Sequence, residues 1–103
     1  MKKTSPYELI DSQLELLRQI KGYPENVTNQ LSNGAKEVLT YGFSNRRDPK
    51  TNAVAAIYTA SVILSEGKPD ITLKELRDYF GSNPMSIKTA SDDFNRRILG
   101  DIF

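Results

Sequence analysis

The segment that begins at Asn83 carries side chains whose types and spacing suit contact with a nucleic acid. Asn83 can cap a helix that has Pro84 in its first turn. The outward positions of this helix include Ser86, Lys88 and Thr89. A lysine can bind a guanine acceptor or a phosphate, and hydroxyl groups can donate to phosphates or base edges. The predicted chemistry is recognition of duplex DNA, with no covalent step.

A second basic group precedes the middle of the chain, in the stretch "SNRRDPK" from 44 to 50. Arg46, Arg47 and Lys50 stand there against the single acidic residue Asp48. Positive charges on a polar connection suit contact with phosphates or with an acidic partner. The alternative is a solvated loop with no binding role. We predict Arg46, Arg47 and Lys50 as DNA contacts together with the four residues of the later helix.

The charge balance argues against a strong DNA binder. The 103 residues contain 14 basic and 13 acidic side chains, for a net charge of +1. Affinity for DNA rests largely on neutralising phosphates. Asp92 and Asp93 follow on the predicted reading face, where they would repel phosphates. Arg77 occupies the position at which the two helices of a DNA-binding helix-turn-helix cross, where a small residue is usual.

The composition argues against an enzyme. Cysteine and histidine are both absent, which removes the usual neutral-pH base and the commonest metal ligands. Asp92 and Asp93 are adjacent on a helix, about 100° apart, and do not converge as a catalytic pair. No glycine-rich phosphate loop occurs. We therefore predict no catalytic residue, no cofactor and no metal site.

The spacing of apolar residues predicts an all-α fold without strands. Capping residues, Pro and Gly place the boundaries of five helices. The first spans 6–21, with a capping box at Ser5 and Glu8, the second runs from Pro24 or Asn26 to 41–43, and the third spans 51–66. The fourth runs from the Thr72 capping box to Gly81, and the last begins at Asn83 and ends at Gly100. Asn33-Gly34 should bend or split the second helix. Residues 5–100 form one domain, between a short tail (1–4) and an apolar end (101–103).

Two features define the expected architecture. The helix at 51–66 contains "AVAAIYTASVIL", which is apolar or small almost all round, so it should be a hub buried by its neighbours. Further along, Leu76 and Phe80 precede Gly81, and Ile87 follows it. This is the spacing of a helix-turn-helix corner, whose second helix enters the major groove by its N-terminal end.

The order of these features resembles one cyclin-box repeat of the transcription factor IIB family, in its archaeal form. The motifs that carry the resemblance are "GYPENV", "GAKEVLTYGF", "NAVAAIYTASVIL" and "ITLKELRDYFGSNPMSIKTASDDFNRRI". The resemblance implies a five-helix cyclin fold and a role in transcription initiation or regulation. In that family two repeats follow a zinc ribbon, grip the TATA-binding protein and contact promoter DNA. It also implies that Ser86, Lys88 and Thr89 lie on the reading helix and that Arg46, Arg47 and Lys50 form a basic loop.

This chain departs from the family in having one repeat and no zinc ligands. It is either an excised fragment or a free-standing relative. Two functions follow. One is a DNA-binding module with promoter-like duplexes and the TATA-binding protein as partners. The other is an adaptor that takes a protein partner in a groove between helices, with Tyr23, Tyr41 or Phe43 as anchors.

No apolar run reaches the roughly 20 residues that span a bilayer, and no signal-peptide core follows Lys2-Lys3. We expect a cytoplasmic protein associated with an archaeal or bacterial nucleoid.

Overall fold

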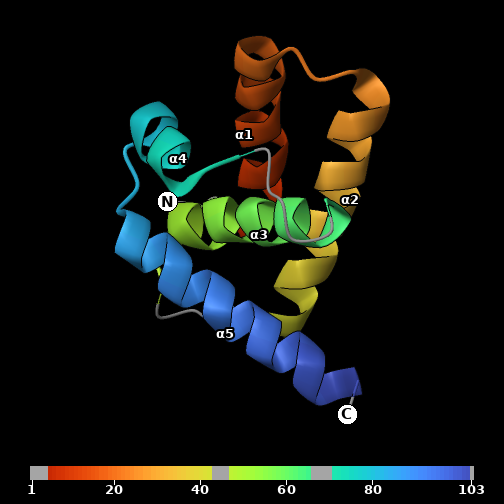
Figure 1. Ribbon diagram of the computed structural model, residues 1–103, viewed down its shortest axis with the longest axis vertical. Helices are drawn as coiled ribbons and strands as arrows, with labels where there is room; N and C mark the ends of the chain where they lie inside the picture. The colour runs from red at the N-terminus through yellow and green to blue at the C-terminus, as the bar shows by residue number, and fades with distance from the viewer. Residues whose placement is uncertain (1–4, 43–46, 66–70, 103) are drawn as a thin grey trace.

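The computed structural model describes residues 5–42, 47–65 and 71–102. This part of the chain is all-helical and contains no strand, which confirms the predicted fold class (Figure 1). The five helices are α1 (Pro6–Lys21), α2 (Glu25–Gly42), α3 (Pro49–Leu64), α4 (Leu73–Phe80) and α5 (Pro84–Ile102). No helix among the described residues has the length and apolar character needed to cross a membrane.

α3 is the predicted hub. It lies across the middle of the molecule, with α1 on one side and α5 crossing on the other, while α2 runs past its end from the side of α1 toward α5 (Figure 1). Every residue from Ala53 to Ile57 is fully buried, because alanines let the neighbouring helices approach from several directions. The burial ends before the helix does, since Ile63 and Leu64 are each 51% exposed. The sequence predicts that Gly67 and Pro69 stop this helix, and both lie outside the described residues.

A buried hydroxyl pair joins α3 to α5. The Oγ atoms of Thr59 and Ser91 lie 2.6 Å apart, and the Thr59 hydroxyl also lies 2.7 Å from the carbonyl oxygen of Ala55. Thr59 is fully buried and Ser91 nearly so. Because buried polar groups need partners, this pair favours one register between the two helices.

The predicted interruption at Gly34 does not split the second helix, because α2 continues through this residue to Gly42. Gly34 instead faces the hub helix. A Cβ atom at this position would lie 3.2 Å from the Cβ of Ala60 and 3.8 Å from Leu64. The glycine therefore serves a close approach between α2 and α3, which local sequence could not reveal.

We expect Gly34→Val to lower the free energy of unfolding by about 1–3 kcal/mol, because the added carbons overpack the contact with Ala60. Urea unfolding followed by circular dichroism measures this. Gly100→Ala is the matched control, since a Cβ there meets no atom of the described residues within 4 Å; it should leave stability unchanged or raise it. Equal stability of Gly34→Val and the unsubstituted protein would contradict the close approach.

Three predictions about helix ends need correction. α3 spans Pro49–Leu64, which is two residues earlier at each end than the predicted 51–66. At α1 the Ser5 hydroxyl accepts the N–H of Tyr7, not that of Glu8, so Ser5 caps the helix without the expected reciprocal box. At the other end of the chain, α5 continues past Gly100 to Ile102. Gly100 is not in the left-handed conformation that ends α1 at Gly22 (φ 71°), so nothing in its backbone terminates the helix.

Candidate nucleic-acid interface

The helical corner expected between α4 and α5 is present. The Thr72 hydroxyl accepts the N–H of Glu75 while the Glu75 carboxylate accepts the N–H of Thr72, which fixes the start of α4. Gly81 ends α4 with φ 69°, a left-handed conformation that favours glycine. Leu76 and Ile87 are fully buried on the two sides of the turn. Apolar packing therefore sets the angle at which α5 leaves the corner.

The first turn of α5 is capped as predicted. The Asn83 side-chain oxygen accepts the N–H of Met85 at 2.8 Å and that of Ser86 at 3.4 Å. These two hydrogen bonds orient the exposed Asn83 side chain at the start of the helix. They also occupy the first two N–H groups of α5, which would otherwise be free to bind an anion. Asn83 thus acts first as a cap, and any contact it makes to DNA must use its amide NH₂ group.

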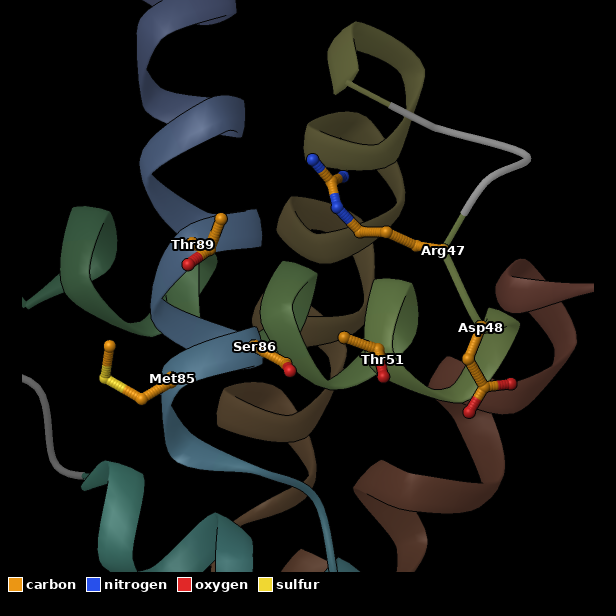
Figure 2. A pocket seen from close by; sticks show the side chains of 6 residues that line it. All are labelled: Arg47, Asp48, Thr51, Met85, Ser86 and Thr89. Carbon is orange, nitrogen blue, oxygen red and sulfur yellow. The ribbon is translucent and has the colours of Figure 1, made fainter.

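A groove of about 440 Å³ runs between the first half of α5 and the start of α3. Its lining comes from both predicted regions: Met85, Ser86 and Thr89 of α5, and Arg47, Asp48 and Thr51 at the start of α3 (Figure 2). Figure 2 shows Ser86 and Thr51 on facing walls of the groove. The two segments that the sequence marked separately, one hydroxyl-rich and one basic, therefore form a single surface.

Arg47 is not a free cation in this groove. Its guanidinium donates to Asp93 at 2.8 Å and to Asn52 at 3.4 Å, and it lies 5.5 Å from the centre of the Phe94 ring. Only 22% of its side chain is exposed. Arg47 therefore ties the segment before α3 to α5, a role the sequence did not suggest. Lys50 is exposed, whereas Arg46 lies outside the described residues.

The acidic pair on α5 is largely neutralised. Asp93 accepts from Arg47 and from Arg97, the latter at 3.3 Å. The hydrogen bond from Arg47 holds the pKa of Asp93 below its ordinary value, although partial burial acts in the opposite direction. Asp92 pairs with Lys88 across one helical turn at 3.4 Å. The repulsion of phosphates expected from Asp92 and Asp93 is correspondingly reduced.

The predicted conflict at Arg77 does not arise. Its side chain is 53% exposed and pairs with the neighbouring Asp78, so it points away from the helix crossing.

A polar cluster joins the corner to α1. Lys21 donates to the Glu75 carboxylate at 2.8 Å, and the Tyr79 hydroxyl donates to the same oxygen at 3.2 Å. The hydrogen bond from Lys21 lowers the pKa of Glu75, with burial opposing it. Both partners are more than seven-tenths buried, so this ion pair helps to hold α4 in place.

Sequence reasoning missed Thr51 and Asp48 as parts of the surface. Asp48 is the N-terminal residue flanking α3, but its carboxylate makes no capping bond there and leaves an acidic group beside the groove. The sequence signal that could have identified them is their position at the start of the hub helix, next to the basic segment. Within the described ranges, no three acidic side chains converge as the ligands of a metal ion would.

We compared the chain with models of protein families, with curated proteins and with solved structures, and none of the three comparisons gave a match.

Proposed function

We propose that the protein is a DNA-binding module that lays the first half of α5 in the major groove of a duplex. The observation that carries this proposal is the groove in which Ser86 and Thr89 meet the segment before α3. A reading helix needs exposed donors at its N-terminal end and a second element that contacts the flanking backbone. The start of α3, with exposed Lys50, supplies the second element.

The balance of charge makes this a weak, salt-sensitive contact. Lys88 and Asp92 are 61% and 57% exposed, and an ion pair between exposed side chains contributes only about 0–1 kcal/mol. Lys88 can therefore exchange Asp92 for a phosphate or a guanine at little cost. Lys50 and Arg96 have no ion-pair partner among the described residues, so their charges are available to the backbone of the duplex.

The resemblance to the transcription factor IIB repeat gives this proposal its biological setting. A single cyclin-like module would act in transcription initiation or regulation on promoter-like duplexes, with the TATA-binding protein as a second partner. The exposed hydroxyls of α5 agree with a reading helix, but the resemblance alone supplies the promoter and the protein partner.

We expect fluorescence anisotropy to detect binding to duplexes, both random and TATA-flanking, at low salt, with an affinity that falls steeply as salt rises. Lys88→Ala and Lys50→Ala should each weaken binding and reduce the slope of log affinity against log salt by about 1. Asp92→Asn should strengthen binding, because it frees Lys88.

Lys36→Ala is the matched control. This lysine pairs with Asp11 between α2 and α1, outside the proposed surface, and its loss should leave the salt slope unchanged. Absence of binding at low salt would overturn the proposal. A preference for one duplex would make α5 a reader of sequence, whereas equal binding to all duplexes would limit it to the DNA backbone.

A further inference from the structure

A second groove lies on the other flank of the hub helix, between α2, the end of α3 and α5. It has a volume of about 300 Å³, and none of the described residues lines both this groove and the groove of the proposed DNA surface. Gly34 and Ala60 line it, together with Tyr41, Ile63 and Ile98. The close approach of α2 to α3 at Gly34 therefore borders an apolar depression.

Large apolar side chains that remain exposed gather at this groove. Ile63 and Leu64 are each 51% exposed, and Tyr41 is 39% exposed. A smaller groove of about 180 Å³, lined by Val27 and other residues, adjoins the first because Leu64 lines both. Single exposed apolar residues are common on protein surfaces, whereas several large ones gathered on one concave surface indicate a binding groove.

One charge accompanies these apolar groups. Glu37 is exposed, and it is the single charged side chain among the described residues that line the larger groove. Among the described residues it forms no ion pair, unlike Lys36 beside it. An acidic group at the edge of an apolar groove favours an occupant that carries a basic side chain next to its apolar ones.

The same features disfavour a second copy of this chain as the occupant. A twofold contact would set one groove against the other, and two concave surfaces leave space between them. It would also bring the two Glu37 carboxylates toward each other, while none of the described residues that line the groove is basic and could offset them. The occupant is therefore convex, apolar and basic.

We infer that this groove binds an amphipathic helix of a partner protein, which inserts aliphatic side chains over Ile63 and Ile98 and places a lysine or arginine against Glu37. Helices recognise such grooves through apolar residues at positions i, i+3 or i+4, and i+7. This inference is independent of DNA binding, because the two surfaces use different residues. The module would then hold a protein on one flank of α3 and a duplex on the other.

The probe is a pair of fluorescent alanine-based peptides of about 16 residues, roughly four helical turns. Both carry leucines at i, i+4 and i+7, and one has a lysine where the other has a glutamate. We expect saturable binding, about threefold to fivefold tighter for the lysine peptide, as an exposed ion pair gives. Methyl signals of Ile63 and Ile98 should shift on titration in nuclear magnetic resonance spectra.

Two variants decide the result. Ile63→Gln should abolish binding without loss of the fold, since half of this side chain is already exposed. Glu37→Lys should reverse the preference toward the glutamate peptide. Ile20→Gln is the control, because Ile20 is also exposed (45%) but lies on α1, away from the groove.

Three outcomes would overturn the inference: no saturable binding of either peptide, binding that survives Ile63→Gln, or a preference that Glu37→Lys does not reverse. A concentration-dependent dimer that Ile63→Gln abolishes, seen by sedimentation, would assign the groove to a second copy instead. The duplex titrations test the other surface, so failure of one proposal leaves the other standing.

Discussion

Phe94→Ala should lower the free energy of unfolding by about 3–5 kcal/mol, the usual cost of emptying a phenylalanine site in a core. Phe94 is among the largest fully buried side chains and lies on the inner face of α5. Removing it leaves a cavity in the core and also takes away the ring beside the Arg47 guanidinium. A loss of this size is a large part of the 5–15 kcal/mol typical of a whole domain.

Urea unfolding measured by circular dichroism tests this, with Leu99→Ala as the control on the same helix. Leu99 is 54% exposed, so its truncation should change stability by less than about 0.5 kcal/mol. A loss below about 1 kcal/mol for Phe94→Ala would mean that α5 does not close the core as described.

Arg47→Ala should destabilise the protein by about 1–3 kcal/mol, because it removes a charge-assisted hydrogen bond to the Asp93 carboxylate, which is itself only 22% exposed. It also removes the cation–π contact with Phe94. If the main role of Arg47 is this contact with Asp93 and Phe94, the salt slope of DNA binding in Arg47→Ala should stay near that of the unsubstituted protein. A slope reduced as strongly as in Lys50→Ala would show instead that Arg47 contacts a phosphate.

The pH dependence of protein stability gives a second test of the ion pair between Arg47 and Asp93. The pKa of Asp93 is lower in the folded protein than in the unfolded chain, so its ionised form stabilises the fold. That contribution is complete above the unfolded-chain pKa of about 4, and it is lost as pH falls through the folded value. The stability gap between the unsubstituted protein and Arg47→Ala should therefore narrow below about pH 4.

Asp92→Asn is the control for this measurement. Asp92 pairs only with exposed Lys88 among the described residues, and an exposed ion pair contributes little, so Asp92→Asn should change the free energy of unfolding by less than about 0.5 kcal/mol. A gap that stays constant down to low pH would mean that Asp93 and Arg47 do not interact as a pair.

The sequence predicted the architecture well, because its signals are local. Ser5, Thr72 and Asn83 cap the helices that they were expected to cap, and Gly22 and Gly81 end helices in the left-handed conformation. These residues act on their own backbone within a few positions. The uniform apolar character of α3 likewise predicted burial directly, since no polar face was available to meet water.

Contacts between helices could not be predicted in this way. Gly34 looked like a break because its low helix propensity is visible in the sequence, whereas its neighbour Ala60 is not. Arg47 looked like a phosphate contact because no local sequence pattern shows that it pairs with Asp93, which is 46 positions away. The segments that form the candidate surface were identified, but which of their charges are already paired depends on tertiary packing.

The hydroxyl pair of Thr59 and Ser91 constrains how this sequence can change over evolution. Thr59 has one proton, and if it donates to the Ala55 carbonyl then Ser91 must be the donor in the contact between them. Losing either hydroxyl alone leaves a buried polar group with fewer partners, whereas replacing both by apolar groups of similar shape costs little. Related chains should therefore carry both hydroxyls or neither, with Val and Ala as the natural apolar counterparts. Single replacements are then passing states, and Thr59 and Ser91 should change together although 32 positions separate them.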